Sequence, residues 1–107
     1  MHNFLLASLT GKFGPTMTLK LKRIYEKHGI RICLSGDLRY SHLVDLCAEI
    51  EQVGQAAILD LHEVDVVDID GIRLLNECQT RGIQLVNCSP YIREWMLQEK
   101  RTRKDEN

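Results

Sequence analysis

Alternating apolar and polar residues predict two β-strands near the start of the chain. Apolar residues alternate with basic ones from position 19 to 26, and a similar alternation runs from 30 to 34. A period of two turns every second side chain toward the same face of a strand. His28 and Gly29 form a turn signal between the two segments. We therefore expect a β-hairpin that ends near Gly36.

The period changes to that of a helix further along the chain. Apolar residues between 43 and 53 recur at spacings of three and four, which places them on one helix face. Ser41 is a suitable N-cap for this helix, and Gly54 stands where helices often end. A shorter apolar stripe at 72–78 predicts a second helix. Pro90 is well placed in the first turn of a third helix.

The remaining apolar runs predict strands. A nearly continuous run at 56–61 is typical of a central strand covered on both faces. Residues 64–69 either extend this strand or turn into the next helix, and 83–88 form a last strand. Strands that alternate with helices require parallel neighbours joined by right-handed crossovers. The sequence thus predicts a single-domain α/β fold, in which an N-terminal hairpin precedes alternating helices and strands and helices cover a mixed sheet.

Size and charge limit the classes of function. The chain has 107 residues, of which 44% are apolar and 27% charged, as expected for one globular domain. Its formal net charge of −1 gives no electrostatic support for nucleic-acid binding. No segment contains the roughly 18 consecutive apolar residues of a membrane span. We therefore expect a cytoplasmic protein that does not insert into a membrane.

The cysteines and glycines give no sign of a metal site or a phosphate loop. The four cysteines lie within apolar stretches and form no C-x-x-C pair, which favours reduced core residues. No histidine pairs with a cysteine at the spacing of zinc ligands. The glycines of the predicted fold are isolated, and no nucleophile has a local base partner in a recognisable motif. We expect no metal, no cofactor and no enzymatic activity.

The two ends of the chain differ from its middle. Residues 1–16 show no period and are broken up by Gly11, Gly14 and Pro15, which predicts a loosely ordered N-terminal arm. Residues 17–99 carry the regular pattern and form the predicted domain. Residues 100–107 are mostly charged with mixed signs, which predicts a solvated tail.

The segment Asp68–Gly71 (DIDG) lies between a predicted strand and a predicted helix. Asp68 is a good N-cap, since its carboxylate can accept a hydrogen bond from a free backbone N–H. Asp70 then falls in the first turn, where a negative charge stabilises a helix by about 0.3–1 kcal/mol. Gly71 has no side chain and lets another surface approach the helix start closely.

Several segments resemble the STAS domain, the fold of the anti-sigma-factor antagonists. Residues 34–38 (LSGDL) resemble the entry that follows an early strand, and 58–68 resemble the central strand. Residues 68–71 resemble the Asp-Ser-Ser/Thr-Gly loop, and 82–90 resemble the last strand and its proline-led helix. The resemblance covers about residues 18–97, most of the chain, and no single motif in it is very specific.

The resemblance implies a bacterial regulatory protein that binds a protein partner and is not an enzyme. In the anti-sigma-factor antagonists, a partner kinase that is also the anti-sigma factor phosphorylates the serine or threonine before the loop glycine. The matching residue here is Asp70, and neither it nor Ile69 carries a hydroxyl, so the usual phospho-switch is absent at this position. The resemblance assigns the partner surface to the loop and the helix that follows it, at Asp68, Ile69, Asp70, Gly71 and Arg73.

Other readings stay open at this point. Asp70 is either a helix-start acid without further role, a permanent carboxylate that mimics the phosphorylated form, or a catalytic or metal carboxylate together with Asp68 and Asp65. The partner is a kinase or anti-sigma protein, or a subunit of a larger complex such as a sensory or lipid-transport assembly. Self-association as a homodimer and the binding of a small ligand or nucleotide are the alternatives.

Overall fold

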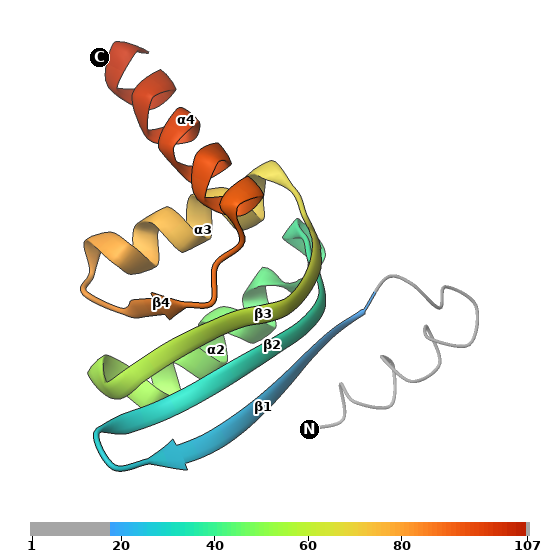
Figure 1. Ribbon diagram of the computed structural model, residues 1–107, viewed down its shortest axis with the longest axis vertical. Helices are drawn as coiled ribbons and strands as arrows, with labels where there is room; N and C mark the ends of the chain where they lie inside the picture. The colour runs from blue at the N-terminus through green and yellow to red at the C-terminus, as the bar shows by residue number, and fades with distance from the viewer. Residues whose placement is uncertain (1–17, 107) are drawn as a thin grey trace.

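The computed structural model describes residues 18–106, and side chains up to residue 103. The arm expected at 1–16 lies outside the described residues. The elements of the described chain, in order, are β1 (Leu19–Glu26), β2 (Gly29–Leu38), η1 (Tyr40–His42), α2 (Leu43–Val53), η2 (Gly54–Ala56), β3 (Ala57–Val67), α3 (Ile69–Thr80), β4 (Gln84–Val86) and α4 (Pro90–Glu106). This α/β arrangement confirms the predicted fold class and order of elements (Figure 1).

The four strands form one mixed sheet in the order β1-β2-β3-β4. β1 and β2 form the predicted antiparallel hairpin, whereas β2, β3 and β4 run parallel to one another. The parallel strands follow one another in a single direction across the sheet, so right-handed crossovers place α2 and α3 on the same face. Figure 1 shows α2 behind the strands.

The core lies between this face of the sheet and the helices. Ile32 and Leu34 of β2 and Leu59 of β3 are at most 1% exposed, and they pack with buried residues of the helices. The residues that alternate with them, such as Arg31 and Asp60, are half-buried on the opposite face. The prediction that the strand at 56–61 is covered on both faces is therefore wrong for the described chain, since its helices cover only one face.

Two boundaries differ from those expected. β3 continues to Val67, so the acidic segment extends the strand. β4 ends at Val86 rather than at 88, because Asn87 adopts a left-handed backbone conformation with φ of 56° and turns the chain away from the sheet. Ser89 directly precedes α4, and its hydroxyl accepts a hydrogen bond of 3.2 Å from the backbone N–H of Ile92.

Ser41 does not cap α2. The chain first makes a short 3-10 turn over Tyr40–His42, and the residue at the N-cap of α2, His42, makes no side-chain cap hydrogen bond. The N–H at the start of this turn is instead satisfied by Asp68, which lies far away in sequence. Tertiary contact therefore replaces the local cap that the sequence pattern suggested.

The charged residues from 100 onward continue α4 through residue 106. In Figure 1 this helix extends away from the sheet beyond α3. The cysteines are all free, as expected, but Cys47 is exposed on α2 and only Cys78 is fully buried. No helix of the described chain is both long enough and apolar enough to cross a membrane.

Gly71 allows the start of α3 to lie directly against the ends of β2 and β3. A Cβ atom at this position would stand 2.6 Å from the carbonyl oxygen of Leu38 and 2.8 Å from a methyl carbon of Val67. Backbone cannot yield as a flexible side chain does, so overpacking here must shift the helix.

We expect Gly71→Ala to lower the free energy of unfolding by about 1–3 kcal/mol, measured by urea denaturation, because the added methyl group meets the Leu38 carbonyl. Glu77→Ala, at an exposed position of the same helix, is the control and should change it by no more than about 0.5 kcal/mol. An unchanged stability of Gly71→Ala would contradict the close approach.

Candidate functional site

One carboxylate joins the starts of two helical segments. Asp68 Oδ1 accepts a hydrogen bond of 2.9 Å from the backbone N–H of Gly71, as predicted for an N-cap. Its Oδ2 accepts a second one, also of 2.9 Å, from the backbone N–H of Tyr40. The backbone N–H of Asp68 donates to the carbonyl of Leu38 at 3.2 Å. These bonds hold the start of α3 and the turn before α2 beside the carboxyl ends of β2 and β3.

Large apolar side chains are exposed around this junction. Tyr40 is 70% exposed, Val44 one turn later is 77% exposed, and Ile69 at the first position of α3 is 37% exposed. We call these three residues together with Asp70 the helix-start patch. An apolar side chain as open as Val44 contributes nothing to the core. Exposed aromatic and aliphatic side chains near a carboxylate are common in protein-binding sites.

Asp70 supplies the charge of this patch. It is half-buried in the first turn of α3, and it makes no hydrogen bond or ion pair with another residue of the described chain. Its carboxylate is therefore available to a partner, whereas that of Asp68 is occupied by two backbone N–H groups. Of the residues predicted for this site, Ile69 and Asp70 are open to a partner. Asp68 and Gly71 hold the start of α3 in place.

Arg73 points away from this patch, toward α4. Its Nε lies 3.3 Å from Oε2 of Glu99, a side chain only 3% exposed, which also accepts from Asn76 Nδ2 at 2.8 Å. Arg103 approaches the same carboxylate at 3.0 Å. Asn76 is buried, because α4 covers one side of α3 and the sheet covers the other. Arg73 therefore helps to neutralise a buried charge between two helices.

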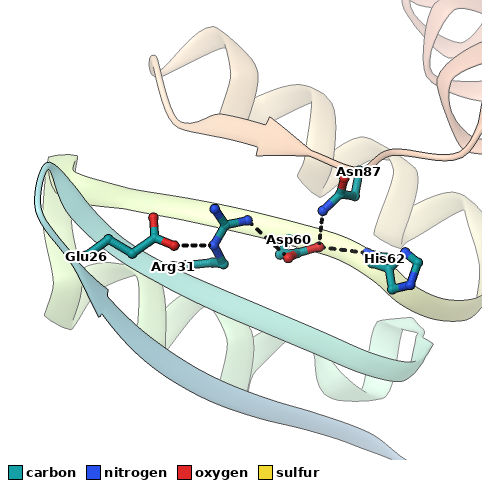
Figure 2. A network of polar contacts seen from close by, with 5 residues as sticks. All are labelled: Glu26, Arg31, Asp60, His62 and Asn87. Atoms are coloured by element: carbon teal, nitrogen blue, oxygen red, sulfur yellow. Dashed lines mark hydrogen bonds and ion pairs between the residues drawn. The ribbon is translucent and has the colours of Figure 1, made fainter.

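A second group of polar side chains lies on the face of the sheet opposite α2 and α3. Figure 2 shows Asp60 at its centre, with Arg31 Nη1 at 3.1 Å and Asn87 Nδ2 at 3.0 Å. Arg31 Nε also donates to Glu26 at 2.8 Å, and the backbone N–H of His62 donates to Asp60 at 3.0 Å. Each partner comes from a different strand or from the segment after β4, so the network ties the strands together across this face.

These contacts shift the pKa values of two groups on the face of the sheet opposite α2 and α3. Burial by itself raises the pKa of Asp60, but hydrogen bonds from Asn87, from the His62 N–H and from Arg31 outweigh it and lower the pKa below its ordinary value. Burial and the nearby Asp60 charge raise the pKa of the Cys33 thiol. Asp60 is therefore an anion at neutral pH and Cys33 a neutral thiol, which is a poor nucleophile.

Tyr40 and Val44 are not among the residues predicted from the sequence for this site. A signal for Val44 was present, since it is an apolar residue that falls off the apolar stripe of residues 43–53. Tyr40 carried no such signal, because its position depends on the hydrogen bond from its N–H to Asp68, 28 residues later.

No protein-family model matches the chain, and no curated protein matches it. A crystal structure of a protein called Mglu is similar to part of it, with 21% sequence identity and a TM-score of 0.49. The similar region covers 60% of this chain and 18% of the Mglu chain, so the chain spans less than a fifth of that protein's length. At this identity and score the likeness assigns neither a family nor an activity.

We expect Asp68→Ala to lower the free energy of unfolding by about 1–3 kcal/mol, because two backbone N–H groups lose their acceptor. Asp70→Ala at the same helix start should cost no more than about 1 kcal/mol, since it loses only the interaction with the helix dipole. Urea denaturation measures both variants. Equal effects of the two substitutions would contradict a stabilising role for the two hydrogen bonds that Asp68 accepts.

The lowered pKa of Asp60 has a consequence for acid stability. A carboxyl whose pKa is lower in the folded state stabilises the fold above its unfolded pKa, about 3.9, and loses this contribution as the pH falls through the folded value. The wild type should therefore exceed Asp60→Asn in unfolding free energy at neutral pH, and the difference should shrink below about pH 4. Urea denaturation over a pH series measures this, and a difference that stays constant with pH would contradict it.

Proposed function

We propose that this chain is a STAS-like regulatory module of the bacterial cytoplasm that binds a protein partner through the helix-start patch and does no chemistry of its own. The proposal rests on the exposure of Tyr40, Val44 and Ile69 near Asp70. The carboxylate of Asp70 makes no hydrogen bond or ion pair within the described residues. The same helix start is the partner surface in the family that residues 34–38 and 68–71 resemble. The sequence likeness and the exposed apolar surface thus favour one region independently.

The chemistry of the patch describes the partner it fits. The three apolar side chains are complementary to an apolar surface that excludes water. Asp70 is complementary to a basic group or to backbone N–H donors within that surface. Because Asp70 is a carboxylate where related modules carry a phosphorylatable hydroxyl, its charge is permanent. We therefore propose that partner choice is fixed in the state that phosphorylation would produce, and that no kinase reverses it at this position.

Arg73 also has a structural role beside the partner contact predicted for it. Its guanidinium pairs with Glu99 between α3 and α4, and its side chain is 54% exposed. In the proposed complex it supports the helix that carries Ile69 and Asp70.

The test is quantitative affinity capture from the native cell with tagged wild type and variants side by side. Val44→Asp and Tyr40→Ala should each reduce the recovered partner at least about tenfold, because central apolar contacts contribute roughly 1.4 kcal/mol or more to such interfaces. Asp70→Lys should do the same by reversing the charge that the partner meets. Asp70→Ser should alter the amount recovered or itself become phosphorylated.

Tyr25→Ala is the matched control, since Tyr25 is 69% exposed and Tyr40 is 70% exposed. It lies on the edge strand β1, outside the helix-start patch, and its loss should leave the recovered partner unchanged. If all variants recover the same protein equally, the partner binds elsewhere and Asp70 is only a helix-start acid.

A further inference from the structure

No helix or strand of the described residues packs on the face of the sheet opposite α2 and α3. Parallel strands such as β2, β3 and β4 are in most proteins covered on both faces. Here a hollow of about 230 Å³ opens on this face, and the residues that line it include Lys22, Ile24, Cys33, Asp60 and Glu63. This open face is separate from the helix-start patch and independent of the function proposed for it.

Charges on the open face are arranged in opposite signs on either side of β2. The strand register places Lys22, Cys33 and Asp60 in one row across β1, β2 and β3. The next row consists of Lys20, Ser35 and Glu63. In each row the β1 residue is basic, the β2 residue neutral and the β3 residue acidic.

A third row differs from these two, because it has apolar residues on both sides of a charged one. Ile24 of β1 and Ile58 of β3 lie on either side of Arg31, and Ile24 is 40% exposed. Arg31 is already neutralised by Glu26 and Asp60 of its own chain. Lys20, Lys22 and Glu63 form no ion pair within the described chain, so their charges are available.

This arrangement is complementary to itself. A twofold axis that runs along β2 lays β1 of one copy over β3 of the other, as an isologous contact requires. Lys20 then meets Glu63 of the second copy, Lys22 meets Asp60, and Ile24 meets Ile58. Two sheets packed face to face cross at about 30° because each sheet is twisted. Residues near the twofold axis stay opposite their partners in the second copy despite this angle. We propose that the open face is a homodimer interface, whose occupant is a second copy of this chain.

Sedimentation of the full chain over a concentration series tests the proposal. We expect a dimer whose dissociation constant rises at least about tenfold in Lys20→Glu, because two symmetry-related attractive pairs become repulsive. The double variant Lys20→Glu with Glu63→Lys restores the pairs in the opposite sense and should return to within about threefold of the wild type. Lys27→Glu, in the hairpin turn, is the charge-matched control and should leave the constant unchanged.

A second measurement uses the thiols and does not depend on charge variants. Cys33 lies on the proposed axis, so a short bis-maleimide should link two copies through Cys33, and Cys33→Ser should abolish the linked dimer. Cys47→Ser, at an exposed position of α2, should leave the dimer linked. A chain that sediments as a monomer at every concentration overturns the proposal. So does a dimer that the double variant fails to restore, or one linked through Cys47.

Discussion

The geometry of the candidate site depends on the carboxylate of Asp68. It accepts hydrogen bonds from the backbone of Gly71 and of Tyr40, so it satisfies free N–H groups at the starts of two helical segments at once. Without it, the turn before α2 would have to find its own cap, which Ser41 does not provide. Gly71 permits the arrangement, because only a residue without a side chain fits against the Leu38 carbonyl. Tyr40, whose N–H donates to this carboxylate, is 70% exposed beside the junction.

The direction in which the strands follow one another gives the molecule two different surfaces. Because β2, β3 and β4 advance one way across the sheet, α2 and α3 share one face, and both begin near the carboxyl ends of the strands that precede them. The helix-start patch lies at that end of the strands. The open face lies on the opposite side of the sheet from α2 and α3, and it carries the polar network around Asp60. One connectivity thus produces exposed apolar side chains at the helix starts and a separate charged face on the sheet.

Local patterns predicted the fold well and the candidate site in part. The order of elements follows from hydrophobic period, and the roles of Asp68 and Gly71 follow from helix capping and close approach. Burial of Asn76 and Glu99 could not be predicted, because it arises where α4 crosses α3. The same holds for Tyr40, whose position is set by a residue distant in sequence. Contacts between elements, which have no period, account for these differences.

If a protein partner covers the helix-start patch as proposed, site-specific photo-crosslinking in the native cell should capture that partner. A photoactivatable phenylalanine analogue would replace Val44 in one strain and the similarly exposed Tyr25 in another. We expect irradiation to attach one discrete protein to the chain at position 44 and none at position 25, and Asp70→Lys to remove that product. Equal labelling at both positions, or none at position 44, would contradict the binding of a protein partner at the helix-start patch.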